Sequence, residues 1–457
     1  MAHVITTRDI LRRRQAAATQ APDVITTSNP RSARPVQRIE YRMVHELLSK
    51  RAWAEAPRVW LVGGGPSLRE FDWSLLAGEV VVGCNRCYER PHVGVTVCVD
   101  GANAPGFLSW AELGKFGDLW SQYTGLKVYS QLEGKHDGIP ADVYVVKRRR
   151  TQGDELDVEG GLPQVNNTGT LALQFAAALG AKDIRLLGFD MGSPGEKQEH
   201  HHDGYPREQS ANVCDAMIPE FGKLAPQLRE LGVSVTQYGE SRLTCFEKYP
   251  LEVAVEELQR KPSRPLVVCA ITAGTGYVRE VEEMVRTARA MGLEVVVEQY
   301  ESRGDWFLNT HYKPVFMEQM LRKYKRPILW LDADSRVRQY PALFDDLTAD
   351  IGWVWWDWDE IGRNGITGIE LSTSILYLRP KAEVYRLLGA WQKANEAAPG
   401  EHDQDNLQHM LEGGFKQGRL KAQQLPMGYA QIFDLQRSLG EPVIEQMQAS
   451  RRFRGRV

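Results

Sequence analysis

The chain has 457 residues, more than the roughly 100 to 200 of an ordinary domain, so two domains are expected. Its 56 basic and 59 acidic residues give a net charge of -3, which excludes a global positive field toward nucleic acid or anionic membranes. Six scattered cysteines do not predict a disulfide framework and suit a reducing compartment.

The first residues lack the apolar core of a signal peptide, and no run of about 18 apolar residues occurs in the sequence. These features predict a soluble cytoplasmic protein without membrane insertion. Residues 1–38 contain seven arginines and two aspartates and lack a sustained apolar period, which predicts a loosely attached basic arm. A smaller basic segment, SRRFRGRV, closes the chain at 450–457. The N-terminal arm is either a solvated terminus or a contact for phosphate or another protein.

Short β-rich runs alternate with helical stretches between residues 58 and 239. The runs are VWLVGG, EVVVGC, VGVTVCVD, KVYS, DVYVVK and IRLLGFD, and a helix is expected over 168–179. Strands that are apolar throughout are typical of a parallel sheet covered by helices on both faces. This pattern predicts a doubly wound α/β domain.

The α/β rhythm restarts after the proline-containing linker KPSRP at 261–265. The expected strands are PLVVCAIT, EVVVEQY, PILWLDAD, IGWVWW and TSILYL, with helices over 277–291 and 314–324. The predicted fold class is therefore α/β with two doubly wound, Rossmann-like domains. The expected boundaries are 1–55 for a basic arm and lead-in helix, 56–240 for a glycine-loop nucleotide-binding domain, 241–265 for a helix and linker, 266–430 for the second α/β domain, and 431–457 for a basic tail.

The strongest chemical signal is the pair of aspartates in PILWLDADS. Asp332 and Asp334 follow a buried strand with i, i+2 spacing, which on a strand would direct both side chains to one face. Two adjacent carboxylates repel unless a cation joins them. Mg²⁺ or Mn²⁺ is bound by a few carboxylate oxygens together with substrate phosphates. The pair therefore predicts a metal site that holds the diphosphate of a donor.

The sequence around this motif resembles a known family. The resemblance is carried by GDWFLNTHYKPVFMEQMLRKYKRPILWLDADSRVRQYPALFDDLTADIG, then by ELSTSILYLRPKAEVYRLLGAWQ and DQDNLQ. These segments are similar to bacterial and phage nucleotide-diphospho-sugar transferases of the GT-A fold, over about 266–413. The resemblance implies a glycosyltransferase that uses a nucleotide-diphosphate sugar and Mn²⁺ or Mg²⁺, with Asp332 and Asp334 as metal ligands.

The same resemblance suggests roles for further residues. Thr272 and Tyr277, at the exit of the first strand, are candidates for base or ribose contacts. Lys313 is a candidate for a phosphate contact, and Asp332 also belongs to the donor site. Asp403, in the DQD of 403–405, is expected near the transferred sugar as a catalytic residue. An aspartate is also favoured in the first turn of a helix, so Asp403 has a structural explanation as well.

Three other matches are less specific. Trp306 and Asn309 occupy family positions near the donor, although a tryptophan is more often a core residue. Ser372–Ser374 takes the place of a small-residue motif on the acceptor side. Its Ser-Thr-Ser replaces the usual Asn-Ser-Gly or Ser-Gly pattern, which leaves the role of each residue open.

A glycine-rich loop, VGGGPSLREFDW at 62–73, follows an apolar strand in the N-terminal half. Its glycines would allow a phosphate or ribose to approach the backbone, and Ser67 adds a hydroxyl. The loop is not the dinucleotide GxGxxG fingerprint, because Pro66 and Ser67 stand where that pattern continues.

This loop belongs to a second resemblance, spanning about 58–239. Asp100, the run NNTGTLALQFAAALGAKDIRLLGFDM and the late HHHDGY carry it further. They resemble a domain family, often found in phage proteins, of sialyltransferase-like domains, motility-associated glycosyltransferases and an archaeal pterin diphosphokinase. The implied nucleotide-binding residues are Gly63, Gly65, Ser67, Asn85 and Asn167. Members of this family move either sugars or diphosphate, so the reaction stays open.

The run His-His-His-Asp at 200–203 is either a catalytic element or a polar loop. Three adjacent histidines cannot all face one ion on regular structure, and His202 is the catalytic candidate among them.

The acceptor is left open by the sequence. The Arg-rich termini and the phage resemblance suggest DNA, with a sugar placed on a modified base in the host cytoplasm, whereas the overall acidic balance argues against a broad DNA footprint. An envelope glycan or a protein acceptor is equally compatible. The glycine-loop domain is alternatively a diphosphotransferase or a nucleotide-binding module, and the oligomeric state is not predicted.

Overall fold

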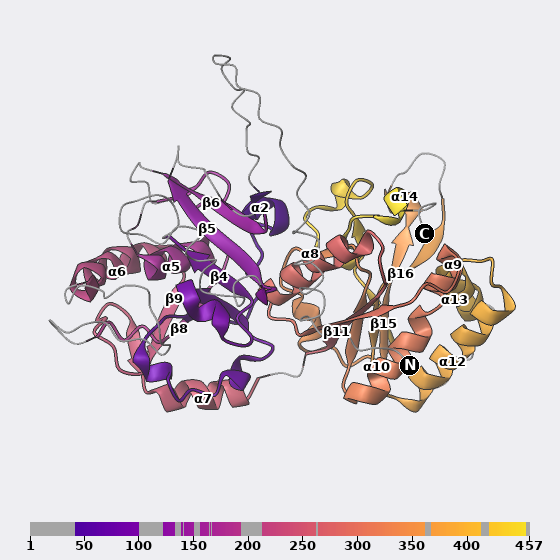
Figure 1. The fold of residues 1–457 in the computed structure, drawn as a ribbon, viewed down its shortest axis with the longest axis horizontal. Coiled ribbons are helices and arrows are strands. Elements are labelled where there is room, and N and C mark those ends of the chain that lie inside the picture. Colours follow the sequence, from indigo (N-terminus) through magenta and orange to yellow (C-terminus); the bar gives the residue numbers. More distant parts are fainter. Residues whose placement is uncertain are drawn as a thin grey trace, which may run out of the picture.

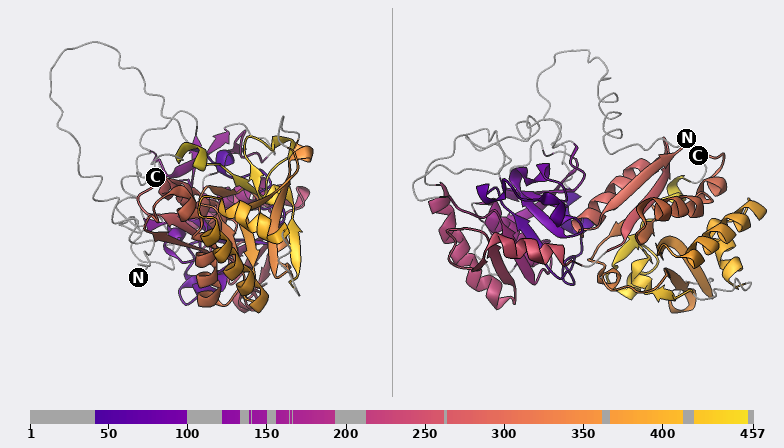
Figure 2. Two further views of the ribbon diagram at one scale, coloured as in Figure 1. Left: turned by 90° about the vertical axis from the view of Figure 1, so that its right-hand side faces the viewer. Right: turned by 90° about the horizontal axis from the view of Figure 1, so that it is seen from below.

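The computed structural model describes residues 42–99, 122–132, 139, 141–149, 156–163, 165, 167–192, 213–261, 264–361, 367–412 and 420–453. Two α/β halves lie side by side in Figures 1 and 2, and each has its own central sheet. The predicted α/β, Rossmann-like fold class is confirmed, with a parallel sheet in the N-terminal half and a mixed sheet in the C-terminal half.

The N-terminal half is built on a ten-stranded sheet in which every strand pair is parallel. Its order is β1-β6-β5-β4-β3-β2-β8-β9-β10, and β7 pairs with β6. The strands are β1 (Arg42–Met43), β2 (Val59–Val62), β3 (Val80–Cys84), β4 (Val95–Cys98), β5 (Leu126–Leu132), β6 (Val143–Arg149), β7 (Leu162–Pro163), β8 (Asp183–Leu187), β9 (Ser234–Tyr238) and β10 (Glu247–Tyr249).

The helices of this half are α2 (Val44–Leu47), α5 (Thr168–Ala178), α6 (Val213–Glu230) and α7 (Leu251–Gln259), with 3₁₀ turns η1 (Pro66–Leu68), η2 (Trp73–Leu76) and η3 (Asn85–Glu89). Asn167 caps α5, because its side chain accepts a hydrogen bond from the backbone N–H of Thr170. Residues 42–55, expected to belong to the arm and lead-in helix, contain β1 and α2 and join this half instead.

The glycine loop occupies a topological switch point. The chain runs from β2 outward to β6 and then continues with β8 on the other side of β2. Ligands of doubly wound sheets bind in the crevice at such a point. The residues following β2 and β8 are therefore placed next to each other.

The C-terminal half has a six-stranded sheet in the order β12-β11-β13-β16-β15-β17. The strands β12, β11 and β13 are parallel, and β16 runs antiparallel to both β13 and β15. Its strands are β11 (Leu266–Thr272), β12 (Val295–Tyr300), β13 (Ile328–Leu331), β15 (Ile351–Asp357), β16 (Ile369–Leu378) and β17 (Ala422–Leu425).

The helices of this half are α8 (Tyr277–Ala290), α9 (Trp306–Thr310), α10 (Lys313–Tyr324), α11 (Trp358–Ile361), α12 (Ala382–Ala397), α13 (Asp403–Glu412) and α14 (Ser450–Phe453), with 3₁₀ turns η4 (Ala342–Phe344), η5 (Met427–Tyr429) and η6 (Arg437–Leu439). None of the helices in the described part of the chain combines the length and the hydropathy that a membrane span needs.

Residues 431–453 of the expected basic tail contain regular structure. They supply β18 (Gln431–Ile432) and β19 (Ile444–Gln446), which form a three-stranded sheet with β14 (Ser335–Val337). Because β14 directly follows Asp334, this pairing brings the C-terminal segment to the aspartate motif.

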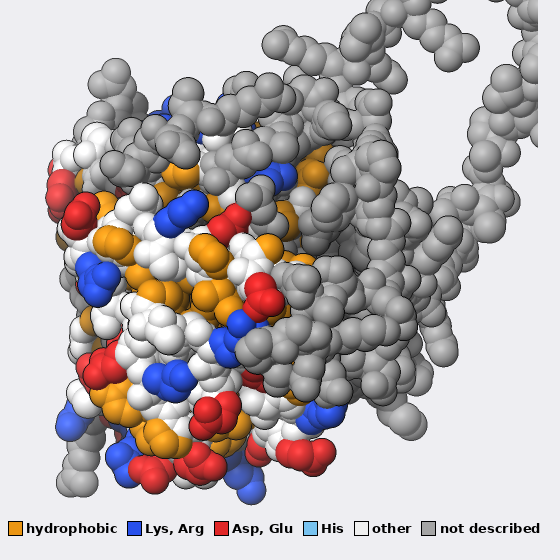
Figure 3. Space-filling model, turned by 90° about the vertical axis from the view of Figure 1, so that its left-hand side faces the viewer, with side chains coloured by type: hydrophobic (Ala, Val, Ile, Leu, Met, Phe, Trp, Pro, Cys, Tyr) orange, Lys and Arg blue, Asp and Glu red, His pale blue; other side chains and the backbone are white. Residues whose placement is uncertain are grey.

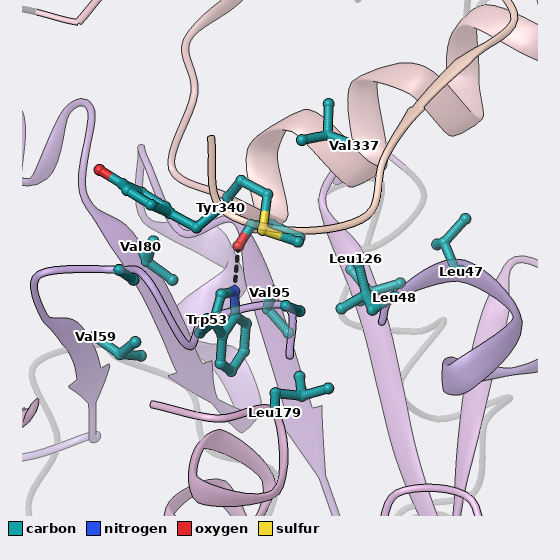
Figure 4. Close-up of a cluster of buried hydrophobic side chains, with 14 of the residues drawn as sticks. Leu47, Leu48, Trp53, Val59, Val80, Val95, Leu126, Leu179, Val337 and Tyr340 are labelled. Atoms are coloured by element: carbon teal, nitrogen blue, oxygen red, sulfur yellow. Dashed lines mark hydrogen bonds between the residues drawn. The ribbon is translucent and has the colours of Figure 1, made fainter. Parts of the chain in front are cut away.

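The two halves share a buried apolar core rather than touching through a linker alone. Figure 4 shows side chains of the N-terminal strands and of Trp53 gathered beneath Val337 and Tyr340 of the C-terminal half. The Trp53 indole donates a hydrogen bond to the carbonyl oxygen of Ala290, 2.9 Å away. Glu283 on α8 accepts from Arg42 (2.8 Å) and from the Tyr144 hydroxyl (2.6 Å). Such burial fixes one half against the other.

Charge is evenly mixed on the outer face of the N-terminal half. Figure 3 shows Lys and Arg side chains interspersed with Asp and Glu over the described part of this face. A continuous basic stripe would be the electrostatic footprint of a nucleic-acid surface, and the described side chains on this face do not form one.

Candidate functional site

A cavity of about 460 Å³ opens in the C-terminal half beyond the ends of β11 and β13. Its wall combines the β11–α8 loop, α9, the first residues of α10 and α13, the β13–β14 turn, β16 and the C-terminal segment. All six residues predicted for the donor and metal site of this half line the cavity: Thr272, Tyr277, Lys313, Asp332, Asp334 and Asp403.

The two aspartates lie in a turn, not on one face of a strand. The strand β13 ends at Leu331, and the N–H of Ser335 closes the turn by donating to the carbonyl oxygen of Asp332 (3.0 Å). The strand-periodicity argument for their direction is therefore wrong in its geometry. The turn nevertheless places both carboxylates on the cavity wall.

One oxygen of Asp332 is already engaged by protein donors. The Trp330 indole N–H donates to Oδ1 over 2.8 Å, and the Lys313 ammonium lies 3.3 Å from the same atom. Because the side chain is one-third exposed, it still faces the open cavity.

Asp334 is deeply buried, and its Oδ2 accepts a hydrogen bond from the backbone N–H of Ala449 (2.6 Å). Burial raises the pKa of Asp334 to about 6, and the neighbouring charge of Asp332 acts in the same direction. A divalent cation between the two carboxylates would relieve both effects.

Lys313, at the start of α10, is buried between acidic partners. Its ammonium lies 3.3 Å from Asp332 Oδ1 and 3.2 Å from Asp403 Oδ2, and it donates to the Thr373 hydroxyl (3.2 Å). These carboxylates keep the pKa of Lys313 above its usual value despite desolvation. The expected phosphate contact is not supported by this geometry, because the three N–H bonds already have protein acceptors.

Asp403 is the first residue of α13 and is almost fully buried. Its Oδ2 accepts from the Thr373 hydroxyl (3.3 Å), and its carbonyl oxygen accepts from the Trp391 indole (2.8 Å). Asp403 therefore occupies the first turn of a helix and also lines the cavity, so its structural explanation and its expected position near the donor are compatible. Of the Ser-Thr-Ser segment, Thr373 is the member that contacts Asp403 and Lys313.

Thr272 and Tyr277 flank the loop between β11 and α8 on the cavity wall. The ring of Tyr277 packs edge-on against Phe453 of α14, with 5.1 Å between ring centroids. Trp306 also lines the cavity, and its ring lies 5.0 Å from that of His402. Tyr277 and Trp306 therefore both contribute aromatic rings to the cavity wall.

Several wall residues were not predicted, among them Glu370 and two residues of the C-terminal segment. Glu370 on β16 accepts hydrogen bonds from the Gln404 amide (2.6 Å) and the Trp358 indole (2.7 Å). Gln446 and Ser450 come from the segment expected to be a tail. That region shows no apolar periodicity in sequence, so its place in the site follows only from its pairing with β14.

The donor set fits a magnesium or manganese ion. Among the described residues, no group of three or more His, Cys, Asp or Glu side chains is arranged to hold a metal ion. Mg²⁺, however, is typically held by one or two carboxylates, with substrate phosphates and water completing the shell. Two adjacent carboxylates on a cavity wall, one of them with a raised pKa, match that requirement.

The glycine loop of the N-terminal half is closed by its own chain. The backbone N–H of Ser67 donates to Asp190 Oδ2 (2.8 Å), and the Ser67 hydroxyl donates to Oδ1 (2.7 Å). Asp190 follows β8, so it enters from the other side of the switch point. The Asp190 carboxylate therefore accepts hydrogen bonds from the Ser67 N–H and hydroxyl, which the sequence analysis had assigned to a nucleotide.

The two loop glycines are needed for this packing. A Cβ on Gly65 would lie 2.4 Å from the carboxyl carbon of Asp190, and one on Gly63 would lie 2.4 Å from the carbonyl oxygen of Gly188. The absence of a side chain at these two glycines therefore lets the residues that follow β8 pack closely against the loop backbone.

Asn85 and Asn167 have structural partners as well. Asn85 has a left-handed backbone (φ 53°), and its Oδ1 accepts from the Thr168 hydroxyl (3.0 Å). The Asn167 amide donates to Glu220 (2.6 Å). The predicted catalytic His202, with the rest of 200–203, and Asp100 lie outside the described residues.

Replacing Gly65 with Ala is expected to destabilise the fold by about 1–3 kcal/mol, because the new methyl group overlaps the Asp190 carboxyl group. Chemical denaturation measures the loss, and Asp190→Ala in the same chain should recover part of it. Equal stability of Gly65→Ala and the parent would contradict the packing role of this glycine.

Comparison with known proteins adds to this geometry. Residues 319–450 match the model of the nucleotide-diphospho-sugar transferase family. The C-terminal half is accordingly a glycosyltransferase domain. The matched range contains Asp332, Asp334 and Asp403, whereas the N-terminal half lies outside it, so the second resemblance stays a prediction.

Solved structures also resemble the chain. One is described as the crystal structure of a glycosyltransferase involved in the glycosylation of the major capsid of PBCV-1. It is 15% identical, the alignment covers 42% of this chain and 97% of that chain, and the TM-score is 0.33. A search of curated proteins found no match.

Proposed function

We propose that the glycosyltransferase domain transfers a sugar from a nucleotide-diphosphate donor to a hydroxyl acceptor, with Mg²⁺ or Mn²⁺ held by Asp332 and Asp334. The observation that carries this proposal is that both carboxylates line the same cavity as Thr272 and Tyr277. We expect Thr272 and Tyr277 to contact the nucleoside and the aspartate turn to hold the diphosphate.

A bound cation would supply charge neutralisation for the departing diphosphate. The protein's part is to present oxygen ligands in a fixed position. Asp332 offers Oδ2, since Oδ1 is bound by Trp330 and Lys313. Asp334 is held by the backbone of the C-terminal segment. Fixed ligands of this kind do not have to reorganise during the reaction.

Lys313 positions the two acidic sites relative to each other. Its ammonium lies between Asp332, the proposed metal ligand, and Asp403, the residue expected near the sugar. The positive charge of Lys313 therefore contacts both carboxylates. Lys313 and the Thr373 hydroxyl both contact Oδ2 of Asp403, and we assign Oδ1 to a hydroxyl of the transferred sugar. Asp403 would thereby orient the donor sugar in the cavity.

The charge of the wall favours an uncharged acceptor. Its acidic side chains are Asp332, Asp334, Glu370, Asp403 and Asp405, whereas among the described residues Lys313 is its single Lys or Arg. A DNA strand carries one phosphate charge per nucleotide, which these carboxylates would repel at the transfer point. A glycan or another neutral hydroxyl compound avoids that repulsion, so this acceptor class is preferred over DNA.

Cation-linked donor binding should weaken in mild acid. The pKa of Asp334 is raised from 3.8 to about 6, so the folded protein binds a proton there that the unfolded chain releases between these values. Without metal, deprotonation of Asp334 lowers the free energy of unfolding as the pH rises from about 4 to about 6. Binding of a cation needs the carboxylate, so affinity should fall roughly tenfold per pH unit below 6.

Calorimetry with Mn²⁺ and a nucleotide sugar between pH 5 and 8 measures this dependence. The phosphates of a nucleotide sugar do not titrate in this range, so the protein is the source of any change. An affinity that stays constant from pH 5 to 8 would count against Asp334 as a metal ligand.

The proposed function is tested by incubating the full-length protein with a panel of nucleotide sugars and Mn²⁺ and following nucleoside diphosphate release. Release from one donor class, increased by an oligosaccharide acceptor and not by duplex DNA, is the expected result. Absence of release from every donor in the panel would refute the proposal.

A further inference from the structure

The segment from Gln446 to Phe453 forms part of the cavity wall beside the aspartate turn. Gln446 ends β19 and pairs with Ser335 of β14, the residue that follows Asp334. Two backbone N–H groups of the segment then bond Asp334: that of Met447 to its carbonyl oxygen (3.1 Å) and that of Ala449 to Oδ2 (2.6 Å). The segment is therefore fastened to one of the proposed metal ligands.

The side-chain amide of Gln446 contains a buried hydrogen-bond donor without an acceptor among the described residues. Its side chain is 1% exposed and lines the cavity. The Ser335 hydroxyl donates to Oε1 (2.9 Å), which fixes the amide, while Nε2 has no hydrogen-bond partner among the described residues. A buried donor without a partner costs about 1–3 kcal/mol, so such groups usually meet a ligand or water.

The far end of the segment reaches the proposed nucleoside end of the cavity. Phe453 packs edge-on against Tyr277 at 5.1 Å. It also lies so close to Gly276 that a Cβ there would be 2.5 Å from its ring. Arg452 bonds Glu280 on α8 (2.8 Å), which holds this end against the helix. The segment thus spans the distance from the aspartate turn to Tyr277.

We propose that Gln446–Phe453 is a donor-binding wall, in which Gln446 Nε2 donates a hydrogen bond to a diphosphate oxygen of the donor and Phe453 positions Tyr277 for the nucleoside. This inference rests on the proposed function and adds residues outside the aspartate motif. A diphosphate is the ligand class because its oxygens are anionic acceptors, and because a cation at Asp332 and Asp334 would hold them next to Gln446.

The test compares Gln446→Met with a matched control, Gln431→Met. Gln431 is also a buried glutamine of the same three-stranded sheet, on β18, but it does not line the cavity. Its amide donates to the carbonyl oxygens of Gln436 (3.0 Å) and Gly440 (2.9 Å). Loss of either side chain disturbs the sheet, whereas Gln446→Met alone changes a residue of the cavity wall.

Binding of UDP, GDP and ADP to full-length protein with Mn²⁺ is measured by calorimetry, with inorganic pyrophosphate plus Mn²⁺ as a probe for the diphosphate alone. Gln446→Met should weaken the preferred nucleotide and pyrophosphate to a similar extent, by roughly 10-fold to 100-fold, as expected for a hydrogen bond to a charged group. Phe453→Ala should weaken the nucleotide but leave pyrophosphate unchanged.

Unchanged nucleotide affinity in Gln446→Met, with binding intact in the parent protein, would overturn this inference and leave the proposed function standing. An equal loss in Gln431→Met would also overturn it, since the effect would then come from the sheet. If the parent protein binds none of the three nucleotides with Mn²⁺, the proposed function fails and this inference fails with it.

Discussion

Replacing Asp332 with Asn should reduce sugar transfer to a low but measurable rate while leaving the protein folded. The substitution keeps the size of the side chain and an oxygen for the Trp330 indole, but it removes a charged ligand from the proposed metal site. If the cation contributes about 3–4 kcal/mol to the transition state, kcat/KM falls roughly 10²-fold to 10³-fold. Transfer from the preferred nucleotide sugar, measured under saturating Mn²⁺, gives this ratio.

Asp346→Asn is the matched control, because Asp346 is an exposed carboxylate of the same half that does not line the cavity. It should retain parental kcat/KM. Full activity in Asp332→Asn, or an equal loss in both variants, would argue against a metal ligand at position 332.

Replacing Lys313 with Met should cost about 3–5 kcal/mol of folding free energy, because Asp403 is left as a buried charge without its cation. Denaturant unfolding in EDTA measures the loss. The double variant Lys313→Met/Asp403→Asn should recover most of it, since the uncompensated charge is then gone as well.

Lys323→Met provides the comparison within the same helix. Lys323 is also on α10, but it is half-exposed and pairs with Glu298 at 3.3 Å. Such a surface ion pair contributes about 0–1 kcal/mol. Similar stability losses for the two lysine variants, or no rescue by Asp403→Asn, would show that Lys313 does not balance the buried carboxylates.

Much of the C-terminal half could be predicted because its elements are continuous in sequence. An apolar strand followed by a charged turn identifies the exit of β13, and the helices α8 and α10 follow the expected periodicity within a few residues. The residues predicted for this site come from separate loops, yet they line one cavity because parallel strands end at the same edge.

The contacts that organise this site could not be predicted, because they join residues far apart in the chain. The pairing of Lys313 with both Asp332 and Asp403 depends on how α10 and α13 pack. The place of Gln446 depends on a three-residue strand pairing whose sequence has no distinctive pattern. Short edge pairings of this kind are selected by tertiary context.

The glycine loop illustrates a different difficulty. Its sequence predicts close approach of another group to the backbone, and such an approach occurs, but the group is Asp190 of the same chain. Glycines in a loop predict that another group can approach the backbone closely, but they do not predict which group does so. The buried junction between the halves also means that tests of either half belong in the full-length chain.

Titration of the full-length protein with nucleotide sugars, in Mn²⁺ and again in EDTA, measures most directly whether a cation between Asp332 and Asp334 holds the donor. We expect one nucleotide class to bind in Mn²⁺ and its affinity to fall at least tenfold in EDTA. The same affinity in both conditions would contradict a metal-held diphosphate.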